Sequence, residues 1–285
     1  MQVKQKEIKT LLDAIPYIQQ FRNKIVVIKY GGSAQTSKEL QEKFAQDITL
    51  LQLTGIKPVV VHGGGAKITD MLNKLQIPSE FIDGHRVTCE DSMRIVEMVL
   101  SGDINKNITS LLNFHGTKAI GISGKDSNCI EAIPKENGKF GYTGVVTAIN
   151  KDIILDLIDE GFVPVIAPIA NSAKPNHPGF NINADIAASQ IAIALNANKV
   201  LFLTDTKGVL NKNGELLNSL DKNDVQSYKN DGTIAGGMIP KVDSCIDAIY
   251  NGVQKAHIID GRVEHSILLE LFTSDGIGTQ FLIKG

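Results

Sequence analysis

Several stretches of this sequence place glycines and charged residues where regular elements begin or end. The run Val59–His62 is apolar and β-branched up to its last residue, and three glycines, residues 63–65, follow it directly. A helical pattern of apolar residues starts at once. Because glycine lacks a Cβ, its backbone N–H can approach a ligand closely, and a helix start adds unpaired N–H groups and the positive end of the helix dipole. This arrangement suits an anion, although a single glycine turn could equally be a tight connection that binds nothing.

A second glycine turn lies directly after a strand that contains a lysine. The β-branched run Ile25–Ile28 leads into Lys29, and Gly31 and Gly32 follow. Ligands of parallel α/β sheets bind outside the carboxyl ends of the strands. Both turns and Lys29 would therefore share one edge of a sheet if the two strands are neighbours. A lysine among backbone N–H groups suits a polyanion, and a phosphate is the obvious one.

A third turn, residues 236–238, precedes a predicted helix that contains Lys241, and Asp185 falls in the first turn of another predicted helix. Two fixed cations such as Lys29 and Lys241 could neutralise the oxygens of a phosphoryl group during its transfer. Asp185 could hold both ammonium groups in place. Each residue also has a non-catalytic interpretation. The two lysines could be solvated surface side chains, as most lysines are. Asp185 could simply stabilise its helix, since an acid at a helix start contributes ~0.3–1 kcal/mol through the helix dipole.

Arg86 and two asparagines are further candidates. Arg86 lies in residues 81–88, which the sequence predicts to be an extended ribbon around an Asp-Gly turn. Its guanidinium could bind a carboxylate through two hydrogen bonds, or it could be a surface arginine with a solvated head. Asn181 and Asn183 could cap the following helix or donate amide hydrogen bonds to a ligand. His62 could simply pack at the end of its strand, and we assign it no proton-transfer role.

Known nucleotide and metal signatures are absent from the sequence. It contains no G-x-x-x-x-G-K-[ST] motif, no G-x-G-x-x-G after a predicted strand, and neither H-R-D nor D-F-G. It also lacks H-E-x-x-H and the paired cysteines of a zinc site. These absences argue against P-loop, Rossmann-type and protein-kinase chemistry, and we expect no protein-held metal.

The composition is that of an ordinary globular protein. The chain has 285 residues, of which 42% are hydrophobic and 21% charged, and its formal net charge is −2. This near-neutral charge does not indicate binding to nucleic acid or to a membrane surface. No uncharged apolar run reaches transmembrane length. The three cysteines are far apart, and the N-terminus lacks the apolar core of a signal peptide. We expect a cytoplasmic protein that binds neither nucleic acid nor membranes.

The elements that must position these residues alternate between strand and helix, which predicts an α/β fold with a mainly parallel sheet. An N-terminal helix over 7–21 is expected to kink or split at Pro16. The predicted strands are 24–30, 58–62, 118–124, 162–168, 199–205, 256–259 and 279–283. The predicted helices are 37–54, 66–76, 90–100, 103–114 (the last capped by Asp103), 151–160, 186–195, 221–229 and 265–272. A hairpin joins 128–133 to 141–149 through an Asn-Gly turn, and 171–180 is expected to be a loop.

Six segments, taken together, resemble the amino-acid kinase family and occur in its order along nearly the whole chain. They are Lys29–Gly32, His62–Gly65, Gly84–Thr88, Asn181–Asp185, Leu203–Asp205 and Gly236–Lys241. The segment His177–Phe180, directly before Asn181, is not part of these motifs. The resemblance implies a three-layer αβα sandwich and the use of ATP with Mg²⁺ carried by the nucleotide. It is strongest with the members that phosphorylate the side-chain carboxylate of N-acetyl-L-glutamate, giving N-acetyl-L-glutamyl 5-phosphate and ADP in arginine biosynthesis.

The resemblance also implies roles for individual residues. Lys29 and Lys241 correspond to the lysines that stabilise the transition state, and Asp185 to the acid that organises them. The substrate-binding positions are Gly64, Gly65, Arg86 and Asn181. The nucleotide-binding positions are Gly31, Gly32, Thr204, Asp205, Thr206, Lys207, Gly208, Val209, Thr233, Ile234, Ala235, Gly236, Gly237 and Met238. On this basis residues 22–180 form the substrate lobe and residues 181–285 the nucleotide lobe of one kinase domain.

Residues 1–21 carry an apolar stripe before the first predicted strand. Its members are Ile8, Leu11, Leu12, Ile15 and Ile18. Such a stripe could pack on its own domain or on another subunit. Arginine-inhibited members of the family carry a similar helix, which interlaces dimers into hexamers, and the segment His265–Thr279 resembles their effector site. We therefore predict a homo-hexamer, a trimer of dimers, that L-arginine inhibits. The effector residues would be Lys199, Glu270 and Gly276.

Two alternatives stay open. The chain could be a sister kinase of the same family that acts on carbamate, aspartate, a nucleoside monophosphate or a related acylated amino acid. It could instead be a catalytically inactive sensor that keeps the fold, although the presence of both lysines and Asp185 argues against this. A purely structural role is the least favoured interpretation, because it would not explain the presence of three glycine turns.

Overall fold

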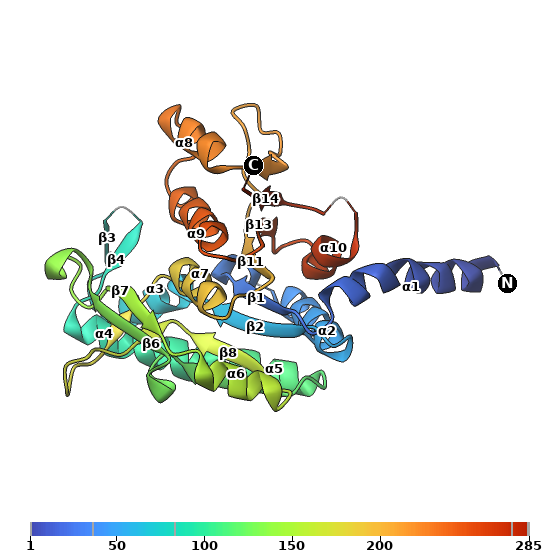
Figure 1. Ribbon diagram of the computed structural model, residues 1–285. Helices are drawn as coiled ribbons and strands as arrows, with labels where there is room; N and C mark the ends of the chain where they lie inside the picture. The colour runs from blue at the N-terminus through green and yellow to red at the C-terminus, as the bar shows by residue number, and fades with distance from the viewer. Residues whose placement is uncertain (1, 36, 83, 275, 284–285) are drawn as a thin grey trace.

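The computed structural model describes residues 2–35, 37–82, 84–274 and 276–283, without the side chains at 2–8, 10, 11, 33 and 34. Ile8 and Leu11 of the predicted apolar stripe therefore lie outside the described side chains. An eight-stranded sheet forms the centre of the protein (Figure 1). Its strand order is β12-β14-β13-β11-β1-β2-β8-β5. Strands β13 and β14 pair antiparallel and the other neighbouring pairs are parallel.

Seven of the eight strands agree with the predicted ones to within a few residues, and the short β12 was not predicted. They are β1 (Ile25–Tyr30), β2 (Lys57–His62), β5 (Ala119–Ser123), β8 (Val163–Ala167), β11 (Lys199–Thr204), β12 (Ser219–Leu220), β13 (Lys255–Asp260) and β14 (Thr279–Phe281). Strands β1 and β2 are buried along nearly their whole length. Continuous apolar runs of this kind are typical of parallel strands that are covered on both faces.

Two hydrophobic cores lie on opposite faces of the sheet. Along β1 the side chains alternate between them: Val27 belongs to one core, and Val26 and Ile28 belong to the other. The first core is closed by α6 (Asp152–Asp159), α7 (Ala184–Ala194), α8 (Lys222–Asn230) and α9 (Met238–Tyr250). The second is closed by α2 (Lys38–Leu53), α3 (Gly65–Lys74), α4 (Glu90–Glu97), α5 (Asn105–Phe114) and α10 (Ser266–Phe272). This arrangement confirms the predicted three-layer αβα sandwich.

Smaller elements stand at the carboxyl edge of the sheet. The hairpin of β3 (Glu80–Ile82) and β4 (His85–Val87) carries Arg86, as expected for an extended ribbon. The hairpin of β6 (Ile130–Pro134) and β7 (Gly144–Ile149) is also as predicted. The short antiparallel pair of β9 (Ile169–Ala170) and β10 (Phe180–Asn181) encloses most of the predicted loop.

The prediction of two separate helices over 90–100 and 103–114 is wrong. A π-helical segment, η2 (Met98–Ile104), joins α4 to α5 without a break, and Asp103 lies inside it rather than at a cap. The segment brings Leu100 and Ile104 against the glycine turn. A Cβ built on Gly64 would lie 2.7 Å from Leu100 Cδ2 and 2.3 Å from Ile104 Cδ1. A larger residue at position 64 would therefore displace Leu100 and Ile104, and π-helical turns recur at functional sites.

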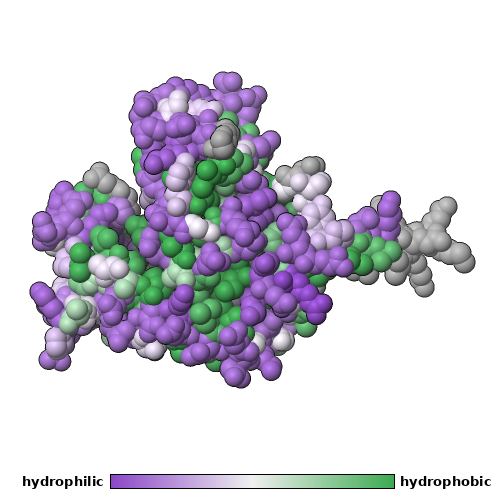
Figure 2. All heavy atoms as spheres, viewed as in Figure 1, coloured by the Kyte–Doolittle hydropathy of each residue, from purple (hydrophilic) through white to green (hydrophobic). Residues whose placement is uncertain are grey.

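Helix α1 (Gln2–Phe21) is a single helix that continues through Pro16. It projects from the body of the protein, and only its C-terminal end lies beside α10 (Figure 1). Leu12 and Ile15 on it are 57% and 41% exposed. Figure 2 shows green, apolar surface on this projecting arm. Within the described residues, no helix combines the length and the apolar character needed to cross a membrane.

Candidate active site

Lys29, Asp185 and Lys241 meet at the carboxyl edge of the sheet, as the sequence predicted. Lys29 Nζ lies 2.9 Å from Asp185 Oδ1, and Lys241 Nζ lies 2.8 Å from Asp185 Oδ2. The side chains of Lys29 and Asp185 are 9% and 6% exposed, and that of Lys241 is 21% exposed. One carboxylate thus holds two ammonium groups, which leaves this three-residue cluster with one positive charge in excess.

The pKa shifts of the group follow from this geometry. Burial alone would raise the pKa of Asp185, but the charges and hydrogen bonds of Lys29 and Lys241 hold it at about 2. Burial lowers the pKa of Lys29, against the opposing effect of the Asp185 carboxylate. Asp185 is therefore ionised at physiological pH and pairs with both lysines.

Three local features place these side chains. Lys29 is the penultimate residue of β1, in register with Phe202 of β11. Asn183 caps α7, because its side-chain oxygen accepts the backbone N–H of Asp185 at 2.8 Å, and this fixes the first helical turn. Lys241 falls in the first turn of α9, just after the glycine turn.

A cavity of about 210 Å³ holds all four predicted substrate-binding residues: Gly64, Gly65, Arg86 and Asn181. Lys29 and Asp185 line the same cavity, and the sequence analysis did not foresee Phe81, Leu100 or Thr143 on its wall. Thr143 lies in a hairpin far along the chain from Arg86, so no local pattern marks it. It reaches the cavity because Thr143 Oγ1 donates a hydrogen bond to the Arg86 carbonyl, 2.5 Å away.

The guanidinium of Arg86 is buried without an acid beside it. Arg86 is 6% exposed, and its Nη2 donates to Thr69 Oγ1 at 2.8 Å and to the Gly65 carbonyl at 3.2 Å. It also lies over the Phe81 ring, 4.5 Å from the centroid. Among the ion pairs of the described residues, none involves Arg86. A buried cation with neutral partners is suited to an incoming carboxylate.

Asn181 is connected to the Arg86 strand through two threonines. Its side-chain amide donates to Thr88 Oγ1 at 3.2 Å, and Thr88 Oγ1 lies 2.9 Å from Thr143 Oγ1. Its backbone N–H donates to the Tyr142 carbonyl at 2.8 Å. These bonds fix Asn181 on one wall of the cavity.

A second cavity of about 460 Å³ adjoins the first. It is lined by Lys29, Gly31, Gly32, Leu203, Thr204, Asp205, Thr206, Gly237, Met238 and Lys241. The other predicted nucleotide residues are not on this wall: Lys207, Gly208, Val209, Thr233, Ile234, Ala235 and Gly236. Val209 and Ile234 are each 1% exposed and belong to the hydrophobic core. Their backbones are engaged within the protein as well: the Val209 N–H donates to Thr279 Oγ1 at 2.8 Å, and the Ile234 N–H donates to the Tyr228 carbonyl at 2.9 Å.

His62 belongs to a buried network that sequence reasoning left out. The Asn105 amide donates to His62 Nε2 at 3.2 Å, to the Val165 carbonyl at 2.8 Å and to the Ile122 carbonyl at 3.2 Å. His62 Nδ1 lies 3.1 Å from the Gly63 carbonyl. Burial lowers the pKa of His62 to about 4, so the ring is neutral and donates from Nδ1. The network fixes the first peptide of the glycine turn.

The three predicted effector residues, Lys199, Glu270 and Gly276, line a separate cavity of about 180 Å³. Tyr17, Gln20 and Phe21 of α1 form part of its wall. His257, which the sequence analysis did not single out, lies 2.5 Å from Glu270 Oε1 through Nδ1. Its Nε2 has no hydrogen-bond partner among the described residues.

Two cavities that meet at a pair of lysines suit a kinase, and comparison with known proteins shows the family. Residues 24–260 match the amino acid kinase family. The chain belongs to the amino acid kinase family. The acetylglutamate kinase of Aliarcobacter butzleri (strain RM4018) is 74% identical over 276 residues, which is 97% of this chain and 92% of that protein. The acetylglutamate kinase of a Nitratiruptor species is 63% identical over 99% of both chains. This chain is thus an enzyme, and within the family it groups with the acetylglutamate kinases.

Among solved structures, an N-acetylglutamate synthase from Neisseria gonorrhoeae, complexed with coenzyme A and N-acetyl-glutamate, superposes with a TM-score of 0.87. It is 25% identical, and the match covers 98% of this chain but only 64% of the synthase. The likeness supports the αβα fold over almost the whole of this chain.

Proposed function

We propose that this protein transfers the γ-phosphoryl group of ATP to the side-chain carboxylate of N-acetyl-L-glutamate, giving N-acetyl-L-glutamyl 5-phosphate and ADP. The observation that carries the proposal is the junction of the two cavities, because Lys29 and Gly32 line both. An acceptor in the smaller cavity and a nucleotide in the larger one would meet at the ammonium of Lys29. The relatives named acetylglutamate kinase favour this acceptor over carbamate or aspartate.

The proposed reaction needs charge neutralisation and no general base. A glutamyl carboxylate has a reference pKa of about 4.3 and is already ionised at neutral pH. One of its oxygens forms a bond to the γ-phosphorus, while the bond to the β–γ bridging oxygen breaks and its electron pair leaves with ADP. Lys29 and Lys241 offset the repulsion between the two anions and the charge that develops during transfer.

Arg86 would bind the α-carboxylate of the acceptor and would orient its side chain toward the junction. Its buried guanidinium offers a planar fork that matches a carboxylate. The N–H groups at the start of α3, after Gly64, add the positive end of a helix dipole on the same wall. Asn181 would offer amide hydrogen bonds to the acetylated end of the acceptor.

The larger cavity fits a nucleotide that carries its own Mg²⁺. It has glycine backbone at Gly31, Gly32 and Gly237 for phosphates, and the oxygens of Thr204 and Asp205 at its edge. Within the described residues, no group of three or more His, Cys, Asp or Glu side chains could hold a metal ion. Mg²⁺ bound to the nucleotide would supply further positive charge to the phosphates.

The test is ADP release by the purified protein with N-acetyl-L-glutamate, L-glutamate, L-aspartate or carbamate as acceptor. We expect the acetylated substrate to give the highest kcat/KM by a wide margin, because Arg86 and Asn181 select a carboxylate and an amide together. A clear preference for carbamate or aspartate would assign the chain to a sister activity. No turnover with any acceptor would indicate an inactive sensor.

We further propose that the cavity between α1 and α10 binds L-arginine and that arginine inhibits the enzyme, as expected of a biosynthetic pathway that ends in arginine. Glu270 is 6% exposed and offers a carboxylate to a guanidinium, and Lys199 offers a cation to the arginine carboxylate. The exposed Leu12 and Ile15 on α1 support a role for that helix in joining dimers into a hexamer.

We also propose that residues 22–180 form the substrate lobe and residues 181–285 the nucleotide lobe, and that the enzyme acts in the cytoplasm.

A further inference from the structure

The nine residues 171–179, which we name the strap, end directly at a proposed substrate-binding residue. The strap connects β9 to β10, and the two strands pair antiparallel, with Asn181 opposite Ile169. Asn181 is the last residue of β10 and lines the acceptor cavity. Any displacement of the strap would therefore move Asn181.

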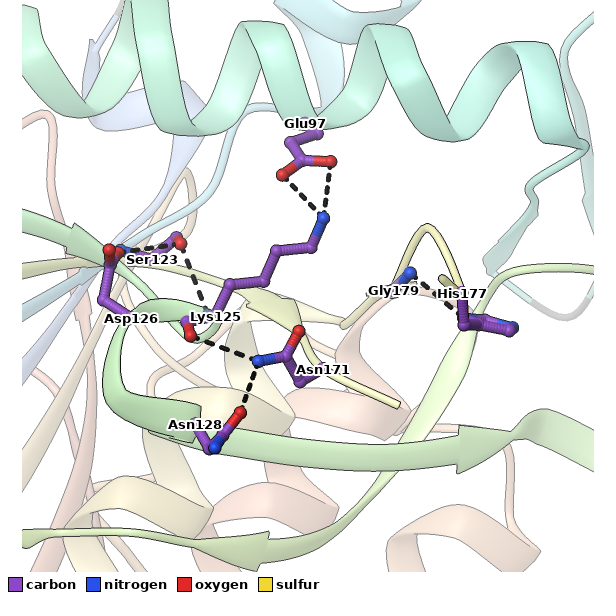
Figure 3. Close-up of polar contacts among 8 residues, drawn as sticks. All are labelled: Glu97, Ser123, Lys125, Asp126, Asn128, Asn171, His177 and Gly179. Carbon is purple, nitrogen blue, oxygen red and sulfur yellow. Dashed lines mark hydrogen bonds and ion pairs between the residues drawn. The ribbon is translucent and has the colours of Figure 1, made fainter. Parts of the chain in front are cut away.

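Both ends of the strap contact Lys125, which lies two residues after the end of β5 (Figure 3). At the first end, the Asn171 amide donates to the Lys125 carbonyl at 3.1 Å and to Asn128 Oδ1 at 2.7 Å. At the other end, Gly179 has a φ of +90°, and a Cβ built there would lie 2.7 Å from Lys125 Cε. Only glycine allows both this backbone conformation and this close approach to the lysine stem.

The ammonium group of Lys125 is in turn held by Glu97. Lys125 Nζ lies 2.7 Å from Glu97 Oε1 and 2.8 Å from Oε2, so both carboxylate oxygens are engaged (Figure 3). The two side chains are 26% and 36% exposed, which makes the pair less screened than a surface ion pair. Glu97 ends α4, and α4 begins two residues after Thr88, the partner of the Asn181 amide. The pair thus links the strap to the strand that carries Arg86.

His177 shapes the turn inside the strap. Its Nδ1 accepts the backbone N–H of Gly179 at 3.0 Å (Figure 3). Its ring lies 4.6 Å from the Phe180 ring and 5.3 Å from the Tyr142 ring, between centroids. The Tyr142 carbonyl accepts the Asn181 N–H, so Tyr142 contacts both β10 and the His177 ring.

We propose that Glu97, Lys125 and His177 are positioning residues that hold Asn181 in place through the strap and so set the affinity for the acceptor, without touching it. None of the three lines either cavity of the active site. This inference rests on the proposed function for its kinetic consequence. Loss of the Glu97–Lys125 pair should weaken acceptor binding and leave the nucleotide site and the catalytic lysines unchanged.

The experiment compares Lys125→Met, which keeps an unbranched stem but removes the charge, with Glu97→Gln and the reversed pair Glu97→Lys/Lys125→Glu. Lys57→Met is the matched control, because Lys57 forms an exposed ion pair with Asp159 at the start of β2, away from the site. We expect both single variants to raise KM for N-acetyl-L-glutamate about three- to tenfold, with kcat and KM for ATP within about twofold of wild type. The reversed pair should recover part of that loss, and the control should show none.

Amide hydrogen exchange over residues 171–181 gives a readout that needs no substrate. The exchange rate should increase in Lys125→Met and Glu97→Gln and stay unchanged in Lys57→Met. Unchanged acceptor KM and unchanged exchange in both single variants would overturn the inference, as would an equal rise in KM for ATP. If the wild-type protein does not use N-acetyl-L-glutamate, the proposed function fails. Faster exchange in the variants would then still establish the anchoring of the strap.

Discussion

Lys29 Nζ lies 2.9 Å from Asp185 Oδ1, and the two side chains are among the most buried charged groups of the described residues. The pair does not neutralise the site, because the other oxygen of Asp185 binds Lys241. Breaking a buried pair leaves an uncompensated charge, which is costly. The structure therefore keeps an excess cation fixed at the junction of two cavities, where the transferred phosphoryl group would pass.

Replacing Lys29 or Lys241 with methionine should remove most of the turnover. Each variant loses one fixed charge from the transition state, and such a loss costs on the order of 10²-fold in kcat or more. Turnover should be measured at saturating ATP and N-acetyl-L-glutamate, with Lys57→Met as a control for the loss of a lysine. Near-normal kcat in either variant would remove that lysine from the mechanism.

Arg86→Lys should raise KM for N-acetyl-L-glutamate far more than KM for ATP. Lysine keeps the charge, but it cannot reproduce the two parallel hydrogen bonds of the guanidinium. The loss of one charge-assisted hydrogen bond in a buried site corresponds to a rise of roughly tenfold or more. Steady-state kinetics with each substrate varied in turn would measure this, and an equal effect on both KM values would place Arg86 away from the acceptor carboxylate.

His62 should make the folded state sensitive to mild acid. Its pKa is lowered from 6.5 to about 4 by burial, so the unfolded chain takes up this proton before the folded one does. The contribution of His62 to stability is therefore complete above pH 6.5 and declines as the pH falls toward 4, by on the order of 3 kcal/mol in total. Urea unfolding of wild type and His62→Gln across this window should show a shallower pH dependence in the variant. Parallel curves would contradict the shifted pKa.

The residues that the sequence placed correctly are those whose position follows from local structure. Lys29 ends a strand and Asp185 opens a helix, and parallel α/β topology brings such positions to one edge. The residues that it missed depend on long-range packing. Thr143 reaches the cavity through a hairpin, and Asn105 reaches His62 because η2 continues the helix where a break at 101–102 was expected. Local propensity cannot predict such a π-helical segment, since its register is decided by what Leu100 and Ile104 pack against.

The last prediction concerns regulation, and it follows from the wall that α1 and α10 share. Tyr17 and Phe21 line the same cavity as Glu270, so arginine bound there would contact the helix that carries the exposed Leu12 and Ile15. We expect the full-length enzyme to be a hexamer with sigmoidal inhibition by L-arginine, because inhibition requires arginine to bind one quaternary state better than another. Deleting residues 1–21 should leave an active dimer with blunted inhibition.

Two variants separate assembly from effector binding without removing the helix. Leu12→Glu with Ile15→Glu charges the exposed stripe but leaves the cavity wall intact, so it should yield dimers that still bind arginine but show little cooperativity. Glu270→Gln should keep the hexamer and raise the arginine concentration for half-inhibition roughly tenfold or more, because the guanidinium loses its carboxylate partner. Light scattering and arginine titrations on all four proteins distinguish these outcomes. A full-length dimer, or a full-length enzyme indifferent to millimolar arginine, would show that the cavity is not a regulatory site of this kind.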